Sequence, residues 1–130
     1  MRFIVDTQVW LWWYAQPEKI GSKAQTLMES PGNEIFLSVA SVWEIGIKYS
    51  TGKLRLPEPA KEYVLSRIAR DAFSLLDVKA THALESASLP WHHKDPFDRL
   101  IIAQSRIENL PIMTSDGQFG KYEAKLIPAG

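Results

Sequence analysis

The stretch RFIVDTQVWLWWYAQ, residues 2–16, places a strand directly before a helix. Arg2–Val5 is a short apolar run typical of a buried strand, and the pattern over Thr7–Gln16 predicts a helix that stops before Pro17. Only Asp6 separates the two elements. A strand that passes at once into a helix is typical of a parallel sheet with helices packed on its faces.

The same alternation continues along the chain. Further strands are predicted at residues 35–37, 73–78, 112–113 and 125–127, a loop at 89–94, and further helices at residues 22–30, 39–50, 57–72, 79–87 and 96–108. Because strands alternate with helices, we predict an α/β fold, a three-layer α/β/α domain with a central, mainly parallel sheet. The 130 residues suit one such domain, spanning residues 1–130.

The composition excludes several classes of protein. Fifteen Lys and Arg residues balance 15 Asp and Glu residues, 45% of the chain is hydrophobic, and there is no cysteine. A disordered chain, a disulfide scaffold, a zinc-thiolate site and a polybasic nucleic-acid binder are therefore not expected. Asp6 and Gln8 interrupt the apolar N-terminal run, and no window is apolar enough for a membrane helix. We expect a soluble, cytoplasmic protein with no membrane association.

Four acidic residues fall near the predicted carboxyl ends of strands. Asp6 follows the first strand, Glu44 lies in the helix after the second, and Asp116 follows the strand at 112–113. Asp98 lies at the start of the helix predicted at 96–108. Because open parallel sheets bind ligands outside the carboxyl ends of their strands, we expect these acids to gather at one edge of the sheet.

Each acid also has an ordinary structural interpretation. Asp6 could cap the following helix, and Asp116 could form an Asx turn. Glu44 could close a capping box with Ser41 or pair with Lys48 one helical turn later. For any one acid this interpretation is the commoner one, but chance would rarely place all four at the same end of a sheet.

Several carboxylates crowded together require a cation, since like charges repel and burial adds to the cost. Oxygen ligands without cysteine favour a hard divalent ion, Mg²⁺ or Mn²⁺. Such a site suits hydrolysis of a phosphodiester, because the ion activates water and neutralises charge on the phosphate.

Four segments together resemble the PIN-domain ribonucleases, and within them the VapC-type toxins of toxin–antitoxin pairs. These segments are FIVDT at 3–7, LSVASVWEI at 37–45, LPWHHKDPFDRLIIAQ at 89–104 and LPIMTSD at 110–116. They occur in the family's order and cover nearly the whole chain. The resemblance implies a PIN-like fold and an endoribonuclease dependent on Mg²⁺ or Mn²⁺, acting as the toxin of such a pair.

The resemblance also implies roles for particular residues. The family's acidic site, which serves both catalysis and metal binding, carries over onto Asp6, Glu44, Asp98 and Asp116. Supporting positions are Thr7, Asp95, Thr114 and Arg99. The implied partners are an RNA substrate, a small cognate antitoxin and a second copy of the chain.

Two other functions stay open on the sequence alone. The helix after the first strand is apolar all round, so at least one of Trp10, Trp12 and Trp13 is expected to contact a partner. The chain could then be a non-catalytic protein-binding module that uses this Trp-rich helix. A weak similarity to haloacid-dehalogenase-type phosphatases rests on Asp6, but Gln8 stands where those enzymes need a second Asp.

For several residues near the acids we expect ordinary structural roles. Arg99 is expected to pair with Asp95 at i,i+4, with positioning of the site's carboxylates as the alternative. Trp43 is expected in the core rather than as a platform for a base. For His92 and His93 we expect loop or packing roles rather than metal binding, with RNA contact as the alternative.

Three cations follow Glu44 closely, namely Lys48, Lys53 and Arg55. The ordinary interpretation is a solvated helix end. The alternative is a surface that guides the RNA backbone.

Overall fold

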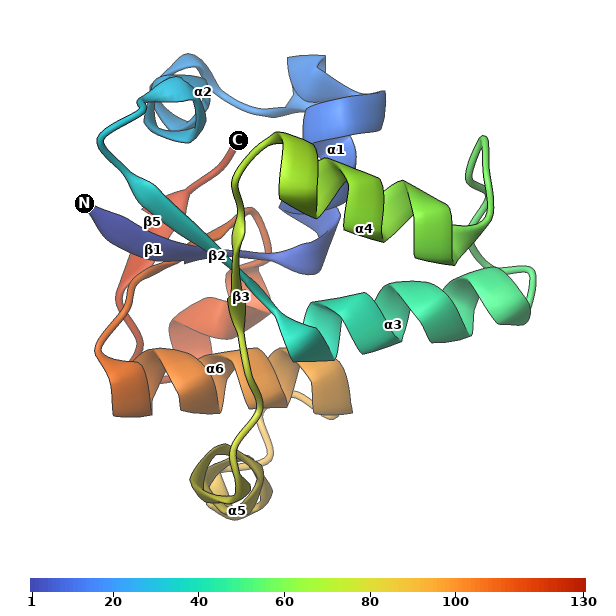
Figure 1. Cartoon of the computed structure of the whole chain (residues 1–130). Coiled ribbons are helices and arrows are strands. Elements are labelled where there is room, and N and C mark those ends of the chain that lie inside the picture. The colour runs from blue at the N-terminus through green and yellow to red at the C-terminus, as the bar shows by residue number, and fades with distance from the viewer.

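A computed structural model describes all residues from 1 to 130 and contains a 5-stranded sheet in the order β3-β2-β1-β4-β5. All neighbouring strands are parallel, which confirms the predicted α/β class (Figure 1). The strands are β1 (Arg2–Val5), β2 (Glu34–Ser38), β3 (Ser74–Leu76), β4 (Ile112–Thr114) and β5 (Leu126–Pro128). The first strand in the sequence is thus the central one.

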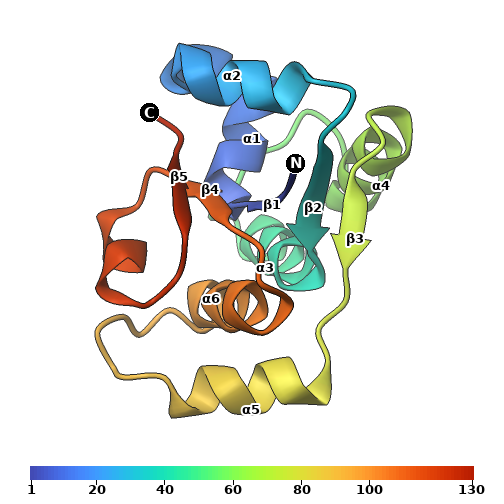
Figure 2. The same cartoon turned by 90° about the vertical axis from the view of Figure 1, so that its left-hand side faces the viewer.

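The helices form the outer layers. They are α1 (Thr7–Ala15), α2 (Ser22–Glu29), α3 (Val39–Ser50), α4 (Ala60–Arg70), α5 (Ala80–Ser88) and α6 (Pro96–Glu108). Figure 2 shows α1 and α2 on one side of the sheet and α6, backed by α5, on the other. This is the three-layer arrangement that the sequence predicts.

Alternation along β1 explains the two layers of core. Phe3 and Val5 belong to the larger hydrophobic cluster, which includes side chains of α1, α2 and α4. Ile4 points to the opposite face and packs in a second cluster with Ile101 and Ile102 of α6. Because successive side chains of a strand alternate between faces, a continuous apolar run fits a strand covered on both sides.

Several boundaries differ from the sequence-based prediction. The helix expected from residue 57 begins at Ala60, because Pro59 stands at its N-cap with extended backbone and cannot continue a helix backwards. This helix ends at Arg70, shortly before Ala72, whose φ is 56°. β3 is shorter than expected and ends at Leu76, which pairs with the last residue of β2.

Two short 3₁₀ helices were not anticipated. They are η1 (Pro17–Lys19), which directly follows the helix predicted at 7–16, and η2 (Gly117–Lys121), which begins shortly after the strand predicted at 112–113. Asp116 begins η2 by accepting a hydrogen bond from the backbone N–H of Gln118. None of the helices combines the length and the apolarity that crossing a membrane would need.

Candidate active site

A cavity of about 400 Å³ opens where the carboxyl ends of β1, β2 and β4 meet. The four acids expected to gather all line it: Asp6, Glu44, Asp98 and Asp116. Thr7 and Asp95 line it too, and Thr114 contacts Asp6 from β4. Residues that are far apart in the sequence therefore share one hollow because the parallel strands end side by side.

Asp6 is buried, with only 5% of its surface exposed. Its side chain does not cap α1. Instead, Oδ2 accepts a hydrogen bond of 2.9 Å from the hydroxyl of Thr114. The pKa of Asp6 is raised to about 6, chiefly by burial; the Thr114 hydrogen bond opposes this rise, and the nearby charges of Glu44 and Asp116 add to it. The helix-cap interpretation of Asp6 is therefore wrong, because its side chain makes no capping hydrogen bond.

Glu44 projects from α3 and is likewise only 5% exposed. Lys48 approaches its Oε2 at 2.6 Å, so the predicted i,i+4 pair forms. The other oxygen, Oε1, is buried and has no hydrogen-bond partner. A buried carboxylate oxygen without a partner is costly, and Glu44 lines the cavity together with further acids.

The start of α3 differs from the capping box considered above. Ser38, not Ser41, caps the helix by accepting from the N–H of Ala40 at 3.0 Å. Ser41 is free to accept a hydrogen bond of 2.7 Å from the hydroxyl of Thr7. This buried contact joins the first turn of α1 to α3, and so connects the elements that carry Asp6 and Glu44.

Asp95 and Asp98 lie together at the start of α6. Asp95 caps the helix, since its Oδ1 accepts from the N–H groups of Phe97 at 2.9 Å and of Asp98 at 3.0 Å. Asp98 lies 2.7 Å from Nε2 of His93. Burial raises the pKa of Asp98 to about 7, opposed by the His93 hydrogen bond and assisted by the charge of Asp95.

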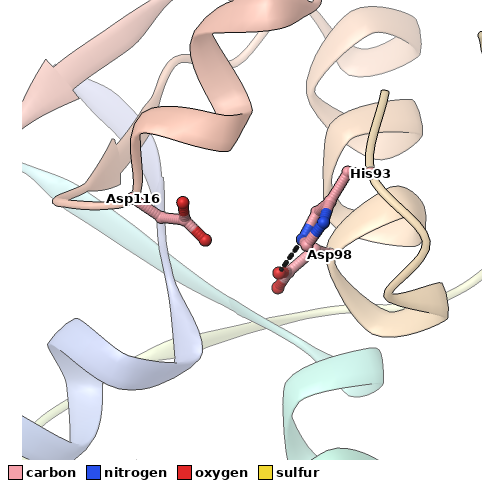
Figure 3. A group of neighbouring side chains, drawn as sticks. All are labelled: His93, Asp98 and Asp116. Atoms are coloured by element: carbon pink, nitrogen blue, oxygen red, sulfur yellow. Dashed lines mark hydrogen bonds and ion pairs between the residues drawn. The ribbon is translucent and has the colours of Figure 1, made fainter. Parts of the chain in front are cut away.

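Asp116 completes the group from the turn after β4. Its N–H donates to the hydroxyl of Thr114 at 3.0 Å, and its Oδ1 accepts from Gln118 at 2.9 Å. The expected turn interpretation therefore holds, and the residue lines the cavity as well. Figure 3 shows Asp116 facing Asp98 and His93, and donor atoms of these three residues lie within 4.8 Å of one another.

Two expectations for neighbouring residues were wrong. Arg99 does not pair with Asp95; it is buried and donates only to backbone carbonyls and a tyrosine hydroxyl. Trp43 is not in the core but is 59% exposed, with its ring against Phe97. His93 lies in a loop, as expected, and its side chain also contacts Asp98.

Sequence reasoning missed His93 because the loop before α6 has no periodicity that fixes where its side chains point. One signal was available. The residue stands just ahead of a helix cap, where the chain turns toward the first helical turn and its acid.

The Trp-rich helix is less available than its sequence indicates. Trp10 has no exposed surface and packs edge-on against aromatic rings of Tyr14, Tyr63 and Phe73. Trp10 therefore cannot contact a partner as the protein is folded. Trp12 and Trp13 are partly exposed, and Trp12 lines the cavity.

Two of the three cations after Glu44 reach the same cavity. Lys48 and Lys53 line it, whereas Arg55 is exposed outside it. The mouth thus carries positive charge beside a group of acids.

Comparisons with known proteins agree with this architecture. A family model described as PIN domain matches residues 3–125. Ribonuclease VapC16 of Mycobacterium tuberculosis is 41% identical over 61 residues, which make up 47% of this chain and 43% of that protein. The chain thus matches less than half of that relative's length.

Solved structures show the same fold over nearly the whole chain. VapBC2 from Rickettsia felis, solved bound to a DNA fragment from its promoter, has a TM-score of 0.74 at 17% identity and covers 100% of both chains. FitAcB from Neisseria gonorrhoeae has a TM-score of 0.67 at 19% identity over 98% of this chain and 97% of that one. DNA-bound VapBC from Salmonella typhimurium gives 0.66 at 15% identity over 98% and 97%.

Proposed function

The chain belongs to the PIN domain family, and from that premise we propose that it is a metal-dependent endoribonuclease acting as the toxin of a toxin–antitoxin pair. The observation that carries the proposal is the group of four acids around one cavity at the carboxyl ends of the parallel strands. The likeness to a ribonuclease of the VapC type supports the same substrate class. We propose further that residues 1–130 act as one PIN domain.

The residues at the cavity fit a hard divalent cation, Mg²⁺ or Mn²⁺. All four proposed metal-binding residues offer oxygen, and Oε1 of Glu44 is buried without a partner. Burial and the charges of neighbouring acids raise the pKa values of Asp6 and Asp98, and a bound cation would offset both effects. Asp6, Glu44, Asp98 and Asp116 would hold the ion, and when bound it would activate water and neutralise phosphate charge.

The chain's own residues prepare the acids for that task. Thr114 holds one oxygen of Asp6 and also accepts from the backbone of Asp116, so a single hydroxyl fixes two acids relative to each other. Asp95 holds the first turn of α6 and thereby the position of Asp98. Positioning of this kind lowers the reorganisation that the reaction would otherwise require.

Substrate binding is assigned to the cations at the mouth of the cavity. Lys53 is exposed and unpaired by any carboxylate, so it is available to an RNA phosphate. Lys48 is held on Glu44, and this hydrogen bond raises the pKa of the Lys48 ammonium. We expect contacts to the phosphate backbone to position RNA without reading its sequence.

The proposed partner is a small antitoxin in the cytoplasm, as in the VapBC complexes whose fold the chain shares. Trp12 lines the cavity and Trp13 is partly exposed beside it, so a protein segment that covers α1 would also close the site. A second copy of the chain is the other proposed partner. The purely non-catalytic binding module is not favoured, because it leaves the gathered acids without a role.

The decisive experiment measures cleavage of structured RNA by the purified chain with Mg²⁺ or Mn²⁺ and with a chelator. Asp6→Asn and Asp98→Asn are expected to lower the cleavage rate at least 100-fold, while the chelator abolishes cleavage. Asp77→Asn is a matched control, because Asp77 is exposed and lies away from the cavity. Parent-like cleavage by both site variants would contradict the proposed site.

A further inference from the structure

Arg99 is a buried cation that contacts no carboxylate. Its Nη2 donates to the carbonyl oxygens of Ser86 at 2.7 Å and Leu89 at 2.9 Å. Its Nη1 donates to those of Pro90 at 2.9 Å and His93 at 3.1 Å. The guanidinium therefore fixes the course of the backbone from the end of α5 into the loop before α6.

Tyr122 holds the same loop from its other side. The buried hydroxyl donates to the carbonyl of Pro90 at 2.9 Å and accepts from the N–H of His93 at 2.9 Å. It also lies 3.3 Å from Nη1 of Arg99. We call Arg99 and Tyr122 the clamp, because together they bind both the N–H and the carbonyl of His93.

The clamped residue is the one that touches the site. Nε2 of His93 lies 2.7 Å from Oδ2 of Asp98, and Figure 3 shows the imidazole directed at that carboxylate. Asp98 and Arg99 are neighbours in α6, so one helical turn carries both the acid and the anchor of the loop that reaches it. Figure 3 also places Asp116 across from the pair.

The acids of the cavity differ in what fixes them. The hydroxyl of Thr114 holds Asp6, the N–H of Gln118 holds Asp116, and Lys48 holds Glu44. The Asp98 side chain likewise has one hydrogen-bond partner, which is His93. Without that partner its carboxylate would be free to rotate about its side-chain bonds.

We propose that His93 is a positioning residue that orients Asp98 for a divalent cation. The clamp holds the backbone of His93 so that the imidazole reaches Asp98. This inference rests on the proposed function. Groups that hydrogen-bond a metal-binding side chain typically change metal affinity by about 10- to 100-fold. His93 acts in this way through an N–H donated to Asp98 and not through a bond of its own to the ion.

Isothermal titration of Mn²⁺ and of Mg²⁺ into the whole chain tests the proposal. His93→Ala is expected to lower the affinity of the protein for both ions by about 10-fold or more. His93→Gln should recover most of that loss, because the Gln amide can place an N–H near the position of Nε2. Tyr122→Phe should lower the affinity for both ions by a smaller factor than His93→Ala does. Combining Tyr122→Phe with His93→Ala should cause no further loss, since the clamp acts through His93.

His92→Ala is the matched control, because His92 is an exposed histidine in the same loop that makes no side-chain hydrogen bond and touches the clamp only through the Tyr122 ring, not its hydroxyl. It should bind both ions like the parent. Thermal unfolding of each variant separates lost positioning from lost folding, and the Gln rescue keeps the test valid where His93→Ala is unstable.

Three outcomes overturn the inference: unchanged affinity in His93→Ala, failure of the Gln variant to rescue, or a loss confined to Mn²⁺. The last would make the imidazole itself a ligand, since nitrogen donors favour Mn²⁺ over Mg²⁺. If the parent binds the ions and cuts RNA in any of these cases, the proposed function stands. A parent that binds neither ion and cuts no RNA overturns both.

Discussion

Single residues carry the electrostatic cost of this site. Asp6 and Asp98 are buried beside other acids, and both pKa values lie well above the ordinary value of 3.8. The folded protein therefore holds protons on these groups at pH values where the unfolded chain has already lost them. Because protonation is linked to folding, the free energy of unfolding of the metal-free protein falls as the pH rises from about 4 to about 6 or 7.

Asp6→Asn tests this cost directly. Asparagine removes the charge and keeps an oxygen for the Thr114 hydroxyl. In a chelator at pH 7.5 the variant should be more stable than the parent by about 2 kcal/mol, and the difference should disappear near pH 4. Urea unfolding at the two pH values measures it. Asp77→Asn should show no such pH-dependent difference, and a gain that is equal at both pH values would contradict the prediction.

The sequence predicted individual residues well where the strand ends constrain them. Asp6 and Asp116 follow paired parallel strands, so their arrival at one edge follows from topology alone. Arg99 was assigned wrongly because i,i+4 spacing allows a pair with Asp95 but does not require it. The loop carbonyls that take its N–H groups instead come from residues whose path no periodic pattern describes.

At the scale of elements, the start of α6 supports the site most directly. Asp95 caps this helix through two backbone N–H groups, one of which belongs to Asp98. Asp95→Ala should cost about 1 kcal/mol of folding stability and lower RNA cleavage as Asp98 loses its fixed position. Chemical denaturation and the cleavage assay measure the two effects.

Asp95→Ser separates the cap from the charge. Serine caps helices nearly as well as aspartate, so stability and most of the cleavage activity should return. A serine variant that is stable but as inactive as the alanine variant would show that the Asp95 carboxylate itself takes part.

The strands and long helices were predictable because hydrophobic periodicity defines them, as in β1, where both faces are covered. The short 3₁₀ helices were not, since a single turn has too few residues to show a period. Pro59 gave a usable signal for the start of α4, but the prediction extended the helix across it.

For the whole molecule, a bound divalent ion should add stability, because it would bind the folded chain and relieve repulsion among the acids. At a concentration of about 100 times Kd the gain is roughly 2.7 kcal/mol. Mg²⁺ or Mn²⁺ should therefore raise the Tm of the parent at pH 7.5, and should raise that of Asp98→Asn much less. Differential scanning calorimetry checks this, with K⁺ at equal ionic strength as the control. An equal rise in both proteins would contradict it.

The formal net charge of zero conceals an uneven distribution. Five of the 15 acids line one cavity, namely Asp6, Glu44, Asp95, Asp98 and Asp116, so the rest of the chain has an excess of cations. Composition alone could not predict this separation, which follows from the order of the strands.

That strand order also bears on the timing of synthesis. β1 is made first, yet its partner β4 lies more than a hundred residues later, and Ile4 pairs with Ile112. Asp6 and Glu44 leave the ribosome long before Asp98 and Asp116, so the nascent chain carries at most two of the four site acids until residue 98 has been added. A nuclease built in this order, as we propose for this chain, would be harmless to the message that encodes it until β4 has been translated and has docked against β1.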